Sequence, residues 1–120
     1  IVSFGKIIKE AYAAAESLKK DGISCEVIDL RTVRPLDIKS VISSVKKTNR
    51  LVILEESWPF GNISTEITYQ VQEQAFDYLD APIIKINTAD TPAPYSPVLL
   101  KEWLPNRADV IKAVKKVLYD

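Results

Sequence analysis

The sequence predicts an α/β protein of three layers (α/β/α), in which helices cover both faces of a mostly parallel sheet. Strand-like and helix-like segments alternate four times along the 120 residues, with short connections. The segment 51–54 is apolar throughout, which is typical of a strand covered on both faces. The helical segments carry apolar stripes at helical spacing. The length is that of one domain, so we expect a single domain over residues 1–120.

The first half of the chain is expected to form two strand–helix units. A strand over 1–4 precedes a helix over 6–21, whose apolar residues recur at helical spacing until a glycine ends it. Charged and apolar residues alternate within 25–30, which predicts a half-buried strand. The next helix, 37–47, begins at an aspartate whose carboxylate can accept hydrogen bonds from the first helical N–H groups.

The second half is expected to add two more units, joined by longer loops. The apolar strand 51–54 is followed by a loop and then by a helix over 62–76. The fourth strand covers 83–87. A proline-rich connection, 91–97, separates that strand from the last helix, 108–119, which carries its own apolar stripe.

Composition excludes several classes of protein. Sixteen basic and sixteen acidic residues cancel, which argues against a nucleic-acid-binding surface. No apolar run approaches the roughly 20 residues of a membrane-spanning helix, so we expect no membrane partner. A single cysteine, Cys25, cannot form an internal disulfide, which favours a reducing compartment. The chain opens on a strand-like segment without a starting methionine, and we expect it to be excised from a longer polypeptide.

The residues that usually carry catalysis are missing from the sequence. Histidine is absent, which removes the commonest general base near neutral pH. The turn after the first strand, 3–6, lacks the repeated glycines of a dinucleotide site. Glu55 and Glu56 follow the third strand, but the first strand ends without carboxylates, so a magnesium-binding receiver site is incomplete. We expect Glu55 and Glu56 to point to opposite sides, and one of them to hydrogen-bond a neighbouring loop.

Three further polar residues have a structural and a functional interpretation. Cys25 has no histidine to activate it, and we interpret it as a small buried apolar residue. Arg31 and Arg34 follow the end of the second strand, where an anion can bind. The favoured interpretation is that they tie loops together, with Arg31 pairing with a carboxylate such as Glu55 or Asp29.

Aromatic residues gather in the loops. Trp58 and Phe60 lie in one loop at the expected ligand-side edge, and Tyr95 and Trp103 lie in or near the proline-rich connection. Stiff aromatic loops are suited to interfaces because they offer contact area at low entropic cost. Trp58 and Phe60 are therefore candidates for a subunit interface, and packing onto the domain's own core is an equal alternative. For Trp103 we favour self-packing.

Several segments of the chain match those of a known family: 22–24 with 26–37, 47–56, 75–82 and 90–95. Together they resemble the C-terminal domain of the transketolase family of thiamine-diphosphate enzymes. The pattern LRT-x-RPLD over 30–37 is shared with sister ketoacid dehydrogenases. The run FDYLDAP over 76–82 and the segment PAPY over 92–95 are most similar to beta subunits of the decarboxylating component of pyruvate dehydrogenase.

The resemblance implies where the chemistry of such an enzyme lies. The family carries its catalytic histidine and its half of the thiamine-diphosphate site in a preceding domain. No catalytic, cofactor-binding or metal-binding residue is therefore expected in this chain, although the parent enzyme uses thiamine diphosphate and magnesium. The resemblance also implies four parallel strands in the order 2-1-3-4, with the family's antiparallel first strand lying upstream.

The resemblance implies a role in assembly. Similar domains contact the alpha subunit and a second beta subunit, and dock the peripheral subunit-binding domain of dihydrolipoyl acetyltransferase. The docking residues carried over are Asp80 and the terminal carboxylate at Asp120. Opposite charge steers such an encounter and fixes its register.

The implied parent is an oxidoreductase that decarboxylates pyruvate and reductively acetylates a lipoyl group, in the bacterial cytoplasm or the mitochondrial matrix. The isolated domain is expected to be inactive. Two alternatives stay open. The chain can be the C-terminal domain of a branched-chain ketoacid dehydrogenase or deoxyxylulose phosphate synthase, or a stand-alone flavodoxin-like module that binds a small anion near Arg31 and Arg34.

Overall fold

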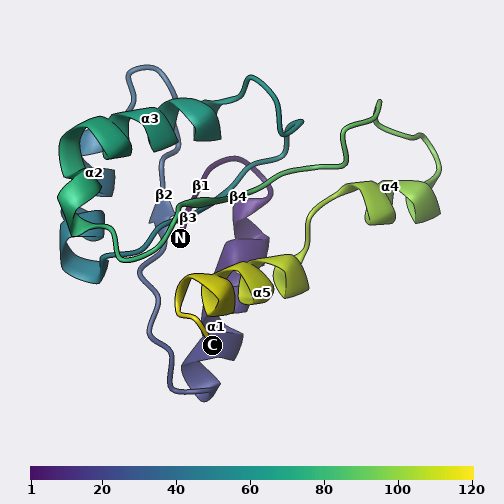
Figure 1. Ribbon diagram of the computed structural model, residues 1–120. Helices are drawn as coiled ribbons and strands as arrows, with labels where there is room; N and C mark the ends of the chain where they lie inside the picture. Colours follow the sequence, from purple (N-terminus) through teal and green to yellow (C-terminus); the bar gives the residue numbers. More distant parts are fainter.

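Four short strands and five α-helices form the chain, which a computed structural model describes over residues 1–120 (Figure 1). None of the helices combines the length and the apolar character that crossing a membrane requires. The elements are β1 (Val2–Ser3), α1 (Ile8–Lys20), β2 (Ile28–Asp29), α2 (Ile38–Thr48), β3 (Val52–Leu54), α3 (Ile63–Ala75), the 3₁₀ turn η1 (Phe76–Tyr78), β4 (Ile84–Ile86), α4 (Pro97–Trp103) and α5 (Arg107–Val117).

The strands form one parallel sheet in the order β2-β1-β3-β4, as the resemblance implied. Val2 faces Ile28 of β2 on one side and Ile53 of β3 on the other. The paired segments are shorter than the sequence predicts. In β2 only the two residues opposite Val2 and Ser3 are paired, because a ladder extends only as far as its neighbouring strand.

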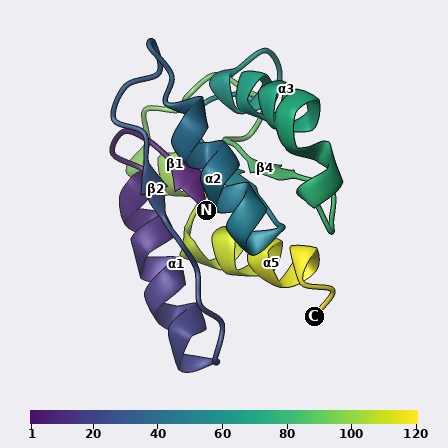
Figure 2. The ribbon, with the colours of Figure 1, turned by 90° about the vertical axis from the view of Figure 1, so that its left-hand side faces the viewer.

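Helices cover both faces of this sheet, which confirms the three-layer prediction. Figure 2 shows α1 and α5 together on one face and α2 with α3 on the other. The central strand β3 serves both layers: Val52 and Leu54 pack among α1 and α5, whereas Ile53 packs among α2 and α3. All three residues are buried, as the uninterrupted apolar run predicts.

Side-chain caps fix where three of the helices begin. The Asp37 carboxylate accepts a hydrogen bond from the Ser40 N–H (3.2 Å), which confirms the predicted start of α2. The Asn62 side chain accepts from the Thr65 N–H (2.9 Å) at the start of α3. Asn106 caps α5, and Asp109 returns a hydrogen bond to the Asn106 N–H (2.9 Å). These caps place the helix starts near the carboxyl ends of the strands.

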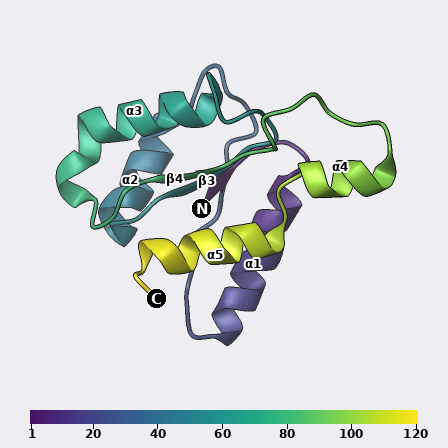
Figure 3. The same ribbon diagram turned by 45° about the vertical axis from the view of Figure 1, so that its right-hand side comes forward.

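The prediction of an irregular connection before the last helix was incomplete, because the segment contains α4. This helix begins at Pro97, and proline is well accommodated in the first turn of a helix. It lies at the end of a long loop, away from the sheet (Figure 3). Val98 and Leu99 are exposed, so the helix buries no apolar stripe of the kind that identified the other helices.

Candidate functional site

The sheet has two opposite edges, and the candidate residues divide between them. The carboxyl edge, where the strands end, carries the loops with Arg31, Arg34, Trp58 and Phe60. The amino edge, where the strands begin, carries Asp80 in the connection before β4. The last turn of α5 also reaches the amino edge, because this helix runs against the strands (Figure 1).

A buried carboxylate lies at the carboxyl edge, but its role is structural. The Glu55 side chain accepts hydrogen bonds from the Ser64 N–H (2.9 Å), the Ser64 hydroxyl (2.8 Å) and the Ile63 N–H (3.3 Å). These donors and the helix dipole stabilise its negative charge at the start of α3. Glu56 is exposed. The expected structural hydrogen bonding of one of these two carboxylates is confirmed.

The two arginines at this edge make only weak side-chain contacts. Arg31 Nε lies 3.6 Å from Asp29 Oδ2, and the arginine side chain is 84% exposed. An ion pair so open to water contributes at most about 1 kcal/mol. Arg34 is exposed and has no ion pair. Their tying of loops stays a prediction.

The two aromatic residues of the carboxyl edge, Trp58 and Phe60, differ in how far they are exposed. Trp58 is half exposed, and its indole N–H donates to the Thr91 carbonyl (2.7 Å). The Trp103 indole N–H donates to the same oxygen (2.9 Å). The loop that contains Trp58 and the end of α4 are therefore both hydrogen-bonded to Thr91. Phe60, by contrast, is 89% exposed. The sequence gives no sign of the shared Thr91 acceptor.

Cys25 is half-buried beside the start of β1 and the end of α5. Burial raises the pKa of its thiol, so the reactive thiolate form is disfavoured near neutral pH. Its surroundings are those of a packing residue.

Asp80 lies exposed at the amino edge and is held in place by its backbone. Its N–H donates to the Asn49 carbonyl (2.8 Å), and its own carbonyl accepts from the Tyr119 hydroxyl (3.4 Å). Asp80 Oδ2 lies 3.9 Å from an Arg50 guanidinium nitrogen. The side chain itself is 59% exposed and remains available to a partner.

Of the last two residues, Tyr119 contacts Asp80, whereas Asp120 lies against α5. The Asp120 N–H donates to the Lys115 carbonyl (3.0 Å), which folds the end of the chain back onto α5. Asp120 is exposed, and no basic side chain lies within ion-pair distance of it. Because Tyr119 contacts the Asp80 carbonyl, the end of the chain reaches the same edge as Asp80. The docking role of Asp80 and Asp120 stays a prediction.

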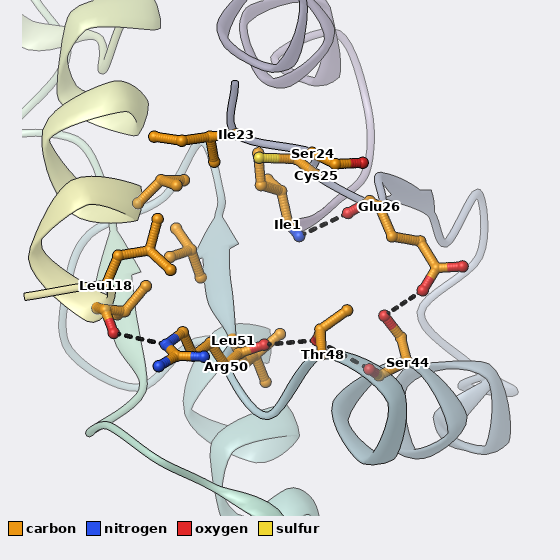
Figure 4. Close-up of a pocket in the computed structure, with 13 residues that line it drawn as sticks. Ile1, Ile23, Ser24, Cys25, Glu26, Ser44, Thr48, Arg50, Leu51 and Leu118 are labelled. Atoms are coloured by element: carbon orange, nitrogen blue, oxygen red, sulfur yellow. Dashed lines mark hydrogen bonds between the residues drawn. The ribbon is translucent and has the colours of Figure 1, made fainter. Parts of the chain in front are cut away.

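Sequence reasoning missed the turn that connects these two segments. Arg50 Nε donates to the Val117 carbonyl at the end of α5 (2.9 Å), and Figure 4 shows its guanidinium lying beside Leu118. Asn49 Nδ2 donates to the Tyr78 carbonyl (2.8 Å). Arg50 also borders a small pocket of about 100 Å³. No local pattern indicates a partner 67 residues away in the chain.

The chain supplies no donor set for the magnesium–diphosphate group that its resemblance associates with the parent enzyme. No group of three or more carboxylate, thiol or imidazole side chains is arranged to hold a metal ion. The carboxyl edge offers one buried carboxylate, and that carboxylate is already committed to α3. The residues of this chain therefore do not fit the cofactor, and we derive no chemical step through it.

Comparison with known proteins decides the family. Residues 1–110 match the model of the transketolase C-terminal domain. The chain belongs to this family. Among solved structures, it superposes on a split-gene transketolase, described as an inactive beta4 tetramer, with a TM-score of 0.83 at 25% identity. That match covers 98% of this chain and 37% of the other. The family resemblance and the fold predicted from the sequence are both confirmed.

Curated relatives of this transketolase-family domain carry a more specific name. The pyruvate dehydrogenase E1 component subunit beta of Rickettsia felis is 53% identical over 99% of this chain, which spans 36% of that protein. The protein of that name from Rhizobium meliloti is 53% identical, with 26% of its length covered. The mitochondrial protein of Dictyostelium discoideum is 46% identical, with 33% covered. The chain thus spans about a third or less of these relatives.

Proposed function

We propose that this chain is the C-terminal assembly and partner-docking domain of a pyruvate dehydrogenase beta subunit. The observation that carries the proposal is the match to relatives of that name, which are 53% identical along 99% of the chain. The chain, one domain over residues 1–120, is then a segment of a longer beta subunit. Its parent decarboxylates pyruvate and reductively acetylates lipoyl groups. Bacterial and mitochondrial relatives support a bacterial cytoplasm or a mitochondrial matrix as its location.

The division of labour follows from the residues that the chain contains. Thiamine diphosphate and magnesium supply the decarboxylation chemistry, and other parts of the parent enzyme hold them. Without histidine or a metal-binding cluster, this domain contributes shape, charge and contact surface. It is therefore proposed to be inactive in isolation.

The amino edge is the proposed docking surface for the peripheral subunit-binding domain of dihydrolipoyl acetyltransferase. Asp80 and Asp120 are both exposed there and lie on neighbouring segments joined through Tyr119. Two exposed carboxylates at one edge attract a basic partner and favour one orientation of it. Because the partner's cations replace water at these oxygens, both carboxylates should contribute to affinity.

The carboxyl edge is the proposed contact with the alpha subunit and a second beta subunit. Phe60 is 89% exposed, and further exposed apolar side chains lie in the α4 segment at Tyr95, Val98 and Leu99. Large apolar side chains in this number are unusual on a surface that stays in water. Trp58 holds the loop in place through Thr91, and Arg31 and Arg34 are proposed to tie the adjacent loop.

The proposal is tested by comparing the isolated chain with the assembled enzyme that contains it. Both are assayed for decarboxylation of pyruvate with thiamine diphosphate and magnesium. We expect turnover by the assembled enzyme, a preference for pyruvate over branched-chain 2-oxo acids, and no turnover by the chain alone. Decarboxylation by the chain would contradict the assembly role, and a branched-chain preference would contradict the choice of substrate.

A further inference from the structure

We propose that Arg50 is a positioning residue that sets how Asp80 and the end of the chain are placed relative to each other. The inference rests on the proposed docking function and names a further residue for that surface. Arg50 lies between α2 and β3, in neither of the two segments that carry the docking carboxylates. Its side chain is 32% exposed, so it is largely fixed by its surroundings.

The first contact of Arg50 fixes the end of α5. Arg50 Nε donates to the carbonyl of Val117, the last residue of the helix, over 2.9 Å. Carbonyl groups in the last turn of a helix lack partners within the helix, so an outside donor holds this turn in place. Tyr119 and Asp120 follow directly on Leu118, the residue after the helix end that Arg50 holds.

The second set of contacts fixes Asp80. The guanidinium lies 3.9 Å from Asp80 Oδ2, while the carbonyl of the preceding residue, Asn49, accepts from the Asp80 N–H over 2.8 Å. Asn49 also donates through its side chain to the Tyr78 carbonyl. Two consecutive residues, Asn49 and Arg50, therefore hold both docking segments. Only Arg50 reaches the two segments with one rigid group.

The charge of Arg50 and its position predict opposite effects on docking. A cation beside Asp80 partly neutralises the carboxylate and repels a basic partner, so its removal should tighten binding if charge alone matters. The pair is half-exposed and 3.9 Å apart, which keeps this effect small. Loss of the guanidinium frees two segments that must then be ordered on binding, which weakens docking. We expect the positional effect to be the larger.

The test is a double-mutant cycle in the assembled enzyme, with the partner's binding domain titrated by calorimetry. We expect Arg50→Met to weaken binding roughly tenfold. Asp80→Asn should also weaken binding roughly tenfold alone, but less than about twofold in the Arg50→Met background. Arg107→Met removes an exposed arginine at the opposite end of α5 and should leave the affinity unchanged.

Arg50→Lys separates position from charge. Lysine restores the cation but presents a single nitrogen, which cannot replace both guanidinium contacts. We expect it to bind the partner as weakly as Arg50→Met, with both variants still assembled and decarboxylating pyruvate. Full rescue by lysine, tighter binding by Arg50→Met, or additive effects in the cycle would overturn the inference. If Asp80→Asn alone has no effect, the docking function itself fails, whatever Arg50 does.

Discussion

At the scale of single residues, Glu55 shows how a buried charge is tolerated without any catalytic role. It directly follows the central strand and accepts three hydrogen bonds from the first turn of α3. The sequence predicted that one of Glu55 and Glu56 would hydrogen-bond a neighbouring loop, and the structure shows that it is Glu55. The neighbouring Glu56 has the same side chain but is exposed, since successive residues along an extended chain face opposite sides.

We predict that Glu55→Ala destabilises the fold by about 2–4 kcal/mol, because it leaves the donors of Ile63 and Ser64 without partners. Glu56→Ala, the matched exposed control, should change stability by less than about 0.5 kcal/mol. Urea unfolding followed by circular dichroism measures both. Equal effects of the two substitutions would contradict the role assigned to Glu55.

Some contacts of single residues could not be predicted from the sequence. The Asp37 cap was predictable because donor and acceptor lie three residues apart. Arg50 and Val117 lie 67 residues apart, and Trp58 and Thr91 lie 33 apart. In both long-range cases the acceptor is a backbone carbonyl, which every residue possesses. The identity of the accepting residue therefore carries no signal.

At the scale of elements, the helices that could be predicted from the sequence are those with apolar residues along one face. Helices α1, α2, α3 and α5 each bury one face against the sheet, and all four were predicted with ends within a few residues. For the segment of α4 the sequence predicted only a proline-rich connection over 91–97 and no helix before 108. The helix buries no residue, so it has no apolar stripe that would have indicated it. The helix begins at Pro97, which fits the first turn of a helix. Counting prolines in the segment does not reveal this, because proline usually interrupts helices.

The Asp37 cap at the start of α2 is expected to make the stability of the fold depend on pH. Hydrogen bonds from the Ser40 side chain, and then from its backbone N–H, hold the pKa of Asp37 below its ordinary value. A carboxylate whose pKa is lowered by folding stabilises the native state above its unfolded pKa, and loses that effect as pH falls through the folded pKa. The contribution of this cap is therefore complete at neutral pH.

We predict that wild type exceeds Asp37→Ala in stability at neutral pH, and that the difference shrinks as the solution becomes more acidic than the ordinary aspartate pKa. Urea unfolding of the two proteins across this range measures the difference. Asp21→Ala serves as the control. Asp21 is an exposed carboxylate at the carboxyl end of a different helix, α1, where it caps no helix start. A difference that is constant with pH would contradict the assigned role of the Asp37 charge.

At the scale of the whole molecule, pattern alone predicted the layers, whereas the strand order came from the family resemblance. Alternation of strands and helices does not distinguish 2-1-3-4 from other parallel orders. The structure places β1 and β3 at the centre, and β3 has the continuous apolar run of a strand covered on both faces. The sheet also separates two exposed edges, which the proposal assigns to different partners.

The segment 26–37, which carries much of the family resemblance, lies apart from the proposed docking residues. Its strand and its loop lead to the carboxyl edge, where Arg31 has only an exposed contact with Asp29. The proposed docking carboxylates lie at the opposite edge, before β4 and after α5. The family resemblance proposed those carboxylates, and the structure adds that Tyr119, which precedes Asp120, contacts the Asp80 carbonyl.

The most direct test of the docking role is calorimetric titration of the acetyltransferase's binding domain into the assembled enzyme. Asp80→Asn neutralises one proposed contact. Deletion of Asp120 removes the second side-chain carboxylate and moves the terminal carboxylate to Tyr119, one residue away from its place. Asp90→Asn is the control at the carboxyl edge. We predict at least a roughly tenfold loss of affinity for the double change, and less at high salt, because screening weakens the wild-type attraction. The control should bind as wild type does. Unchanged affinity after the double change would contradict the assignment of the amino edge as the docking surface.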